Sequence, residues 1–567
     1  MWKQMELLFQ ELYQQTLQVL HLQRVLQRLP HPENPKENLW SVVNERSADS
    51  NEKDEDLLVF IFWKDVTSKL SSSLRKASQD SNFVGNQLVV DYPKVMRIVF
   101  DFLGRLETHQ ELRQSYHKLK GLFKQEQKSM LINAFSWCEA GYIKKMTNQL
   151  ENLAGKICEL RFNEVPEITN QNVNFRFVGQ FSSVLKSNIE VVYMGEETKV
   201  LILPKLLLGL SKVLSDISKS MKDQIVNTTQ INMVGSQVNP SYIRNAIIFN
   251  ISNRLVEDIQ AILIGHNIRI QITETNEHNE KDSENLTQNS LIQMSSSLGS
   301  NVHIQSTIIK PIFEKTFNQL NTILSSIFKE DFTSSSLDPQ NMKDSPMGMC
   351  SPYVTQLHQQ IQQFSTTLLP LFTPCKLLRE HLKELVERVA SSFLLYASML
   401  RPLGEGGKLK LTSDMAQIEL SLTPICTFKD VPVTVYHLES GKPHTIPLSQ
   451  QWHSFRSLIY TEDHKVLEFV DLENLHPSYT LHHLFSRMPM DLAFPALPAS
   501  PFQSVFSEQV RYGMWIRSLT NHDLIAAFSG QLKAYMVLVN KRGDTQYPNL
   551  YPVLDLLCRK LNKAFEN

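Results

Sequence analysis

The chain is poor in glycine, has almost no net charge and lacks any long apolar run, and each shortage excludes a class of protein. Its 567 residues include only 19 glycines, which favours helices over folds built on tight turns. The formal charge of −1 provides no overall attraction for nucleic acid or for acidic membrane surfaces. The densest apolar run, 57–63, is far shorter than the roughly 20 residues that cross a bilayer.

Cysteine is also scarce and scattered. The six cysteines form no Cys-x-x-Cys pair, and this spacing in a large chain is typical of reduced thiols in the cytosol. The first residues, Met1–Glu6, lack the layout of a secretory signal, because Gln and Glu recur throughout the first helical segment. We therefore expect a cytosolic protein.

Recognisable catalytic motifs are missing as well. The Gly-rich stretch 404–408 suggests a phosphate-binding loop, but Pro402 replaces the leading glycine and Leu409 replaces the hydroxyl that would bind magnesium. There is no Gly-x-Ser-x-Gly elbow and no His-Glu-x-x-His pair. The six tryptophans are dispersed, without the basic and aromatic pattern of single-strand nucleic-acid binding. We expect no catalytic residue, no cofactor, no nucleic-acid partner and no enzymatic activity.

Three histidines, His476, His482 and His483, lie close together in the sequence. A zinc site usually needs four ligands with tight spacing, often including cysteine, and nothing nearby completes such a set. We interpret them as surface or interface histidines and expect no metal site.

Helical periodicity is what the sequence does contain, along nearly its whole length, and it predicts an all-α protein. Residues 1–160 are predicted to form a helical bundle and residues 161–330 a second one with a disordered insertion at 266–303, which is polar and lacks an apolar period. Residues 331–352 read as a linker. A carboxy-terminal bundle follows over 353–567, with an insertion at 428–451 that could be a hairpin or a surface loop.

The first helix, 1–29, has a heptad-like seam that Pro30 ends. Its members are Met5, Leu8, Leu12, Val19, Leu22, Leu26 and Leu29, with Gln15 interrupting the series. Four heptads with few flanking charge pairs favour a helix in a bundle over a coiled coil.

The stretch 378–408 is the most informative in the chain. Apolar residues at three- and four-residue steps predict an amphipathic helix with one buried face, formed by Leu378, Leu382, Leu385, Val389, Phe393, Tyr396 and Leu400. Pro402 and three glycines then end it. Asp414 and Gln417 have the spacing of a capping box, which predicts the start of another helix there.

This stretch, Leu-Arg-Glu-His-Leu through Arg-Pro-Leu-Gly-Glu-Gly-Gly-Lys, resembles subunit five of the conserved oligomeric Golgi complex. Weaker similarities lie in Met1–Leu8, His21–Leu26, Asp91–Lys94, Glu139–Tyr142, Leu484–Pro489 and Gln531–Tyr535, so that the resemblance spans most of the chain. Relative to the family, the chain is expected to be shortened at its amino terminus.

The resemblance implies an elongated rod of stacked helical bundles, as in multisubunit tethering complexes. It implies a non-enzymatic subunit in intra-Golgi retrograde vesicle-mediated transport, in the cytosol and peripherally on the cytosolic face of the Golgi membrane. Other subunits of the complex, especially subunit seven, are the expected partners, with membrane-fusion proteins and small GTPases as further candidates. The alternative is a soluble helical regulator that binds a small GTPase or membrane-fusion helices.

The charged residues of the stretch are the candidate partner-binding site, because a buried face would not require them. They are Arg379, Lys383, Glu387, Arg388, Glu405 and Lys408. The simpler interpretation is that this helix belongs to the core of one bundle.

Overall fold

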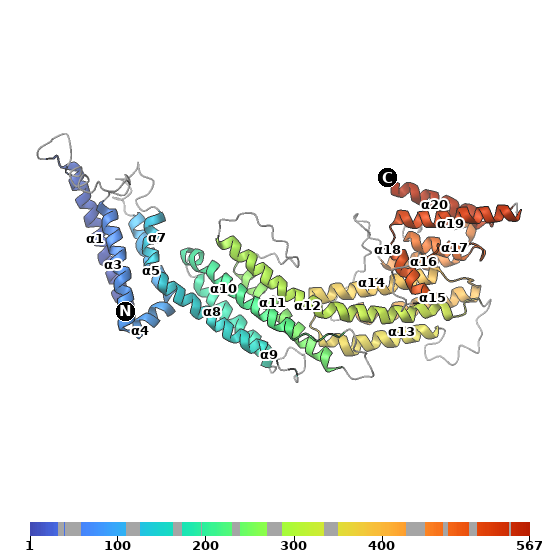
Figure 1. Cartoon of the computed structure of the whole chain (residues 1–567), viewed down its shortest axis with the longest axis horizontal. Helices are drawn as coiled ribbons and strands as arrows, with labels where there is room; N and C mark the ends of the chain where they lie inside the picture. Colours follow the sequence, from blue (N-terminus) through green and yellow to red (C-terminus); the bar gives the residue numbers. More distant parts are fainter. Residues whose placement is uncertain are drawn as a thin grey trace. The chain divides into compact units, whose positions relative to one another are not determined.

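The structure is a computed structural model, and its described residues are all-α, as predicted. They are 1–31, 39, 58–108, 125–160, 162, 173–193, 196–228, 239–268, 286–333, 350–426, 448–468, 475–497, 507–543 and 546–566. No β-strand occurs within these ranges, and helices account for most of them (Figure 1). The predicted insertion at 428–451 lies outside them except for 448–451, which are helical.

The chain divides into two compact units, where the sequence had suggested three bundles. Unit 1 comprises Met1–Arg161, Thr169–Gln224 and Arg254–His303, and unit 2 comprises Phe162–Ile168, Ile225–Asn253 and Ile304–Asn567. The unit boundary falls inside two helices, α11 (Pro240–Gly265) and α12 (Leu286–Leu324). A boundary inside a continuous helix leaves no linker and no change in amino-acid composition, so the sequence could not locate it.

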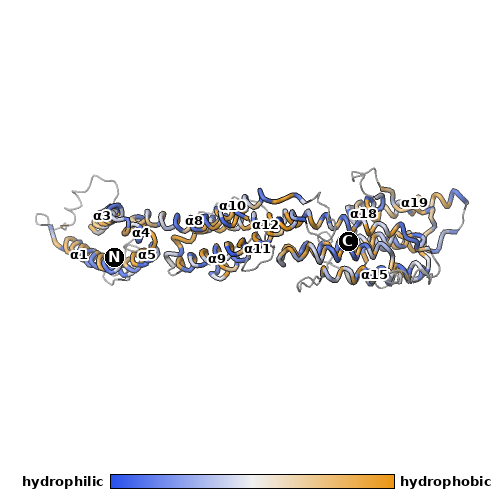
Figure 2. The backbone as a smooth tube through the Cα atoms, turned by 90° about the horizontal axis from the view of Figure 1, so that it is seen from below, coloured by the Kyte–Doolittle hydropathy of each residue, from blue (hydrophilic) through white to orange (hydrophobic). Residues whose placement is uncertain are grey.

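Unit 1 contains two groups of packed helices. The first is α1 (Trp2–Arg28), α3 (Leu58–Asp80), α4 (Asn82–Val90), α5 (Tyr92–Thr108) and α7 (Gln125–Asn133). The second is α8 (Ser136–Cys158), α9 (Val173–Val192) and α10 (Glu196–Asp223), which pack on one another (Figure 1). In Figure 2 orange and blue alternate along these helices, as expected for amphipathic helices that share an apolar core.

Unit 2 is built around α14. Its elements after α12 are η1 (Ser325–Lys329), α13 (Pro352–Gln363), η2 (Phe364–Leu368), η3 (Leu369–Leu371), α14 (Lys376–Ser398), α15 (Glu405–Cys426), α16 (Leu448–Tyr460), η5 (Asp463–Glu468), α17 (Pro477–Ser486), α18 (Glu508–Ser518), α19 (Asn521–Arg542) and α20 (Leu550–Glu566). Helix α14 contacts α15, α16, α17 and α18. The end of α19 is fixed by Gly543 in the left-handed conformation, at φ 76°.

The predicted disordered insertion at 266–303 is wrong for residues 286–303, which form the first half of α12. Met294, Leu298 and Asn301 are fully buried there. The Asn301 side-chain amide donates to the carbonyl oxygens of Ser297, at 3.0 Å, and Leu214, at 3.3 Å. Small polar side chains that bond to the backbone let a serine- and asparagine-rich helix enter the core, so composition misled the prediction. Residues 269–285 lie outside the described residues.

Candidate interaction surfaces

The most informative stretch forms the core helix of unit 2. All seven apolar residues predicted to line one face of α14 and its end are buried, none more than 5% exposed. From Val389 to Leu400 every residue is buried, on all faces of the helix. The simpler interpretation of this stretch, a bundle core, therefore describes most of it. Only the first half of α14 presents charged side chains to solvent.

The Gly-rich turn after α14 has a packing role. The Gly404 amide donates to the carbonyl oxygen of Phe332 at 2.8 Å, and α15 begins at the next residue, Glu405. Gly407 lies against the same backbone: a Cβ atom built on it would be 2.0 Å from the Phe332 oxygen and 2.7 Å from its carbonyl carbon. No side chain fits in that space. The glycine is required by the close approach of two backbone segments, not by a phosphate.

Asp414 joins two helices of unit 2. It is fully buried in the middle of α15, so the prediction that it caps the start of a helix after residue 414 is wrong. Its carboxylate instead accepts bonds at the amino terminus of α13, from the Ser351 amide at 2.9 Å, the Ser351 hydroxyl at 2.6 Å and the Tyr353 hydroxyl at 2.9 Å. Burial raises the pKa of Asp414 to about 6, although these hydrogen bonds oppose the rise. The group holds the α13–α15 pair in register.

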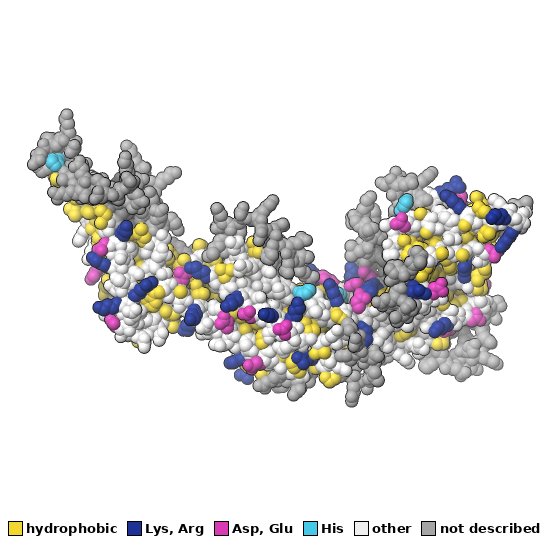
Figure 3. All heavy atoms as spheres, viewed as in Figure 1, with side chains coloured by type: hydrophobic (Ala, Val, Ile, Leu, Met, Phe, Trp, Pro, Cys, Tyr) yellow, Lys and Arg dark blue, Asp and Glu magenta, His cyan; other side chains and the backbone are white. Residues whose placement is uncertain are grey.

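The six predicted partner-binding residues do not form one patch. Arg379 is exposed on the first turn of α14, and Lys383 lies 3.9 Å from Glu387 one turn later. Glu405 and Lys408 pair with each other at 2.7 Å on α15. Figure 3 likewise shows charged side chains of both signs scattered over the visible face.

Arg388, the sixth of these residues, is held by its own chain. Its guanidinium forms a two-point ion pair with the Glu314 carboxylate of α12, at 2.5 and 3.0 Å. It also lies 3.9 Å from the centre of the Phe317 ring. The bonds to Arg388 lower the pKa of Glu314. Arg388 therefore joins α14 to α12 within the chain. From the sequence alone, a charged residue with this role cannot be distinguished from one that binds a partner.

The prediction that His482 and His483 lie on a surface is wrong, because both are buried in α17, whose ten residues are all buried. The His482 Nδ1 donates to the Ser478 carbonyl at 2.5 Å, so its Nε2 accepts from the Tyr512 hydroxyl at 2.9 Å. Burial lowers the pKa of His482 to about 4. The His483 Nε2 accepts from the Arg487 guanidinium at 3.0 Å. Hydrogen bonds at both ring nitrogens of His482, and at Nε2 of His483, allow these rings to serve as core residues.

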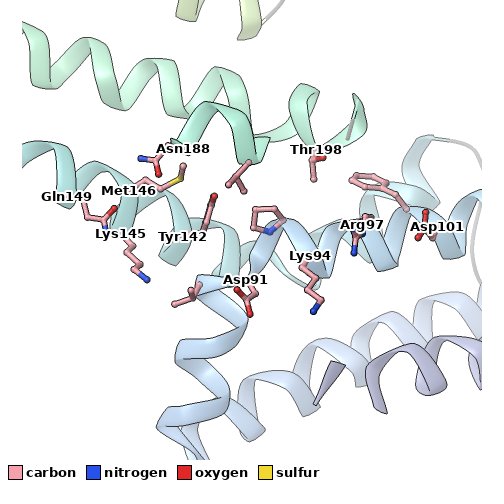
Figure 4. A pocket seen from close by; sticks show the side chains of 14 residues that line it. Asp91, Lys94, Arg97, Asp101, Tyr142, Lys145, Met146, Gln149, Asn188 and Thr198 are labelled. Atoms are coloured by element: carbon pink, nitrogen blue, oxygen red, sulfur yellow. The ribbon is translucent and has the colours of Figure 1, made fainter. Parts of the chain in front are cut away.

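Unit 1 contains a cleft of about 710 Å³ beside α5 and α8. Lys94, Arg97 and Lys145 line it together with Asp91 and Asp101, so charges of both signs are present. Figure 4 shows the amino groups of Lys94 and Lys145 directed away from the cleft interior, where Tyr142 and Asn188 lie. These cations do not converge on one point, and the cleft has no clear ligand preference.

A second face of α1 is exposed. The structure buries Met5 of the predicted seam, half-buries Leu12, Val19 and Leu26, and leaves Leu8, Leu22 and Leu29 exposed. The helix packs on α3 and α5 through a different set of residues, Met5, Phe9, Thr16, Leu20 and Gln23. The sequence predicted the apolar seam of α1, but it did not predict which side of the helix packs against the rest of unit 1.

Among the described residues, no three or more His, Cys, Asp or Glu side chains gather as they would to hold a metal ion. No helix in the described part of the chain is long and apolar enough to cross a membrane. Burial raises the pKa of the Cys138 thiol to about 12 and that of Cys558 to about 11, which makes both thiols poor nucleophiles.

Comparison with known proteins identifies the relatives of this chain. The family model described as conserved oligomeric Golgi complex subunit 5, C-terminal, matches residues 1–103, which contain α1, α3, α4 and most of α5. Proteins named conserved oligomeric Golgi complex subunit 5 align with 98% of the chain in Arabidopsis thaliana, at 20% identity, and with 100% in Mus musculus, at 21% identity. The resemblance to subunit five of the conserved oligomeric Golgi complex is confirmed.

The relatives are longer than this chain. It covers 60% of the Arabidopsis protein, 64% of the mouse protein and 58% of the Dictyostelium discoideum protein of the same name, to which it is 21% identical. The chain thus spans about three fifths of the length of the subunit-five proteins that it matches. The Arabidopsis and mouse alignments, which cover 98% and 100% of this chain, include both the α1 seam and the α14–α15 stretch.

Proposed function

We propose that the protein is a non-enzymatic subunit of a Golgi vesicle-tethering complex that acts in intra-Golgi retrograde transport. The observation that carries the proposal is the similarity of nearly the whole chain to proteins named as subunit five of the conserved oligomeric Golgi complex, from a plant and an animal. An all-α protein with buried histidines and high-pKa thiols is in keeping with a role in assembly. The other subunits, with subunit seven first, are its partners, and it is peripheral on the cytosolic face of the Golgi membrane.

The charged residues of the α14–α15 stretch are proposed to contact a partner: Arg379, Lys383, Glu387, Arg388, Glu405 and Lys408. Substitutions at the exposed residues of this set test the proposal best, because they disturb the packing of unit 2 least. Arg379 is exposed, and the Glu405 side chain is 75% exposed. Charge reversal at these two positions leaves the Arg388–Glu314 ion pair intact. Rim charges of this kind set partner choice more than affinity.

Affinity purification of the tagged chain from its own cells, followed by mass spectrometry and imaging, tests the proposal. We expect the other subunits of one Golgi complex in constant ratio, and Golgi localisation of the tag. Recovery of a single small GTPase in a nucleotide-dependent manner, without those subunits, would support the helical-regulator alternative instead. Arg379→Glu with Glu405→Lys is expected to lower the yield of one partner, while the melting temperature falls by no more than the small contribution of the exposed Glu405–Lys408 ion pair.

A further inference from the structure

Arg517, in the last turn of α18, is a cation for which the described part of the chain supplies no carboxylate. Its side chain is exposed, and its guanidinium has one hydrogen bond to the described residues, in which Nη2 donates to the Ser392 hydroxyl of α14 at 2.5 Å. A guanidinium carries its N–H donors in a planar fork that fits a carboxylate. Most of the fork of Arg517 therefore remains available to a ligand from outside the chain.

The surroundings of the Arg517 guanidinium disfavour its positive charge. The side chains that interact with it, Ser392, Tyr396 and Tyr479, are each no more than 4% exposed. Burial lowers the pKa of Arg517 against the opposing effect of the two tyrosines, and the charge of Arg388 lowers it further. The carbonyl end of α18 compensates only in part, because a helix terminus carries about half a charge. An anion at Arg517 would supply the missing compensation.

Arg388 and Arg517 differ in what they can offer a partner. The charge of Arg388 is neutralised by its two-point ion pair with Glu314. Ser392 connects the two arginines, because its hydroxyl donates to the Arg388 carbonyl oxygen at 2.6 Å and accepts from the Arg517 guanidinium. The two guanidinium groups thus have one described carboxylate between them, and the charge that remains uncompensated is that of Arg517.

We propose that Arg517 binds an aspartate or glutamate side chain of another subunit of the tethering complex, an inference that rests on the proposed function. A free anion fits less well, because one fork on an exposed surface holds it by a single charge that salt screens. A carboxylate on a protein partner is kept in place by the contacts around it, which raise its effective concentration at the fork. Arginine is also enriched among the residues that anchor protein interfaces. This site extends the partner-binding surface proposed for α14 onto α18.

The test removes the charge of Arg517 in the tagged chain. Arg517→Gln eliminates the charge and the fork, while its side-chain amide remains a donor for the Ser392 hydroxyl. Lys533→Gln is the matched control, because it removes one positive charge from an exposed side chain of α19 in the same unit. Both proteins are purified from cells and the accompanying subunits are quantified. Melting temperatures are measured on the isolated chains.

A crosslink identifies the residue that faces Arg517. A photo-crosslinking amino acid replaces the exposed Ser518 in a chain that retains Arg517, and the crosslinked peptide is sequenced. The acidic residue nearest the crosslink is then changed to arginine and combined with Arg517→Glu. This exchange of charges restores the pair only if the two residues are in contact.

We expect Arg517→Gln to reduce the recovery of one subunit at least about tenfold, as the loss of an interface anchor does, and the control to leave every subunit unchanged. The melting temperature of Arg517→Gln should stay within about 2 °C of the unaltered chain, because no ion pair between described residues is lost. The crosslink is expected in that same subunit, and the charge exchange should restore its recovery.

Unchanged recovery of every subunit with Arg517→Gln, or a larger fall in its melting temperature, would overturn the inference while leaving the proposed function standing. So would a crosslink confined to this chain, or a charge exchange that restores nothing. Failure of the unaltered chain to recover any Golgi subunit would instead overturn the proposed function.

Discussion

Replacement of Gly407 by alanine should destabilise unit 2, because the added methyl group has nowhere to go. The new Cβ would lie 2.0 Å from the Phe332 carbonyl oxygen and 3.0 Å from its Cα atom. The obstacle is backbone, which cannot rotate away as a side chain does. That same oxygen accepts the hydrogen bond of the Gly404 amide at 2.8 Å, so moving it sacrifices the bond. Relief of the clash therefore requires that two chain segments separate.

The size of the effect follows from three contributions. Overpacking of a fitted site costs about 1–3 kcal/mol. Loss of the Gly404 hydrogen bond adds about 1 kcal/mol. Alanine returns somewhat less than about 1 kcal/mol through its better helix propensity. The free energy of unfolding should fall by about 1–3 kcal/mol, and the melting temperature by about 2–5 °C for a unit of this size.

Thermal unfolding followed by circular dichroism at 222 nm, with a urea titration at fixed temperature, measures both quantities. Gly530→Ala in α19 is the control, because outside its own stretch of helix no atom lies within 4 Å of its added Cβ. There the propensity gain acts alone, and the melting temperature should stay level or rise. A Gly407→Ala protein as stable as the unaltered chain would refute the packing account of the Gly-rich turn.

Three further predictions concern other parts of the chain. Leu298→Ala should lower the free energy of unfolding, measured by urea titration, by about 2–5 kcal/mol, because Leu298 is fully buried in α12. An unchanged free energy of unfolding would show that residues 286–303 do not pack in the folded protein. In the unaltered protein the raised pKa of Asp414 means that the folded state binds the proton more tightly than the unfolded chain. This tighter proton binding stabilises the folded state fully below pH 4, and the stabilisation is lost as the pH rises through about 6. Asp414→Asn should remove this pH dependence from the free energy of unfolding. If the two proteins differ in unfolding free energy by the same amount from pH 4 to 7, the prediction is wrong. Arg388→Glu should lower stability by about 1 kcal/mol, and Glu314→Arg in the same chain should recover part of the loss; additive effects of the two changes would show that the pair does not couple.

Local patterns were predicted well because they depend on neighbours in the sequence. The apolar face of α14 and the all-α class follow from periodicity. The resemblance to subunit five was readable from the stretch 378–408. The charged residues of that stretch were assigned to one site, but Arg388 and Lys383 have partners in their own chain. Sequence spacing cannot reveal a carboxylate such as Glu314, 74 residues away.

The sequence by itself determined that this chain is helical, where its apolar stripes run and which family it resembles, because a helix repeats every 3.6 residues whatever surrounds it. Tertiary structure alone decided which stripe is buried. On α1 the packing of α3 and α5 selected Phe9 and Leu20 and left Leu22 in solvent. It also decided that Asp414 and His482 belong inside, since a buried polar group is tolerated only where distant residues supply its hydrogen bonds.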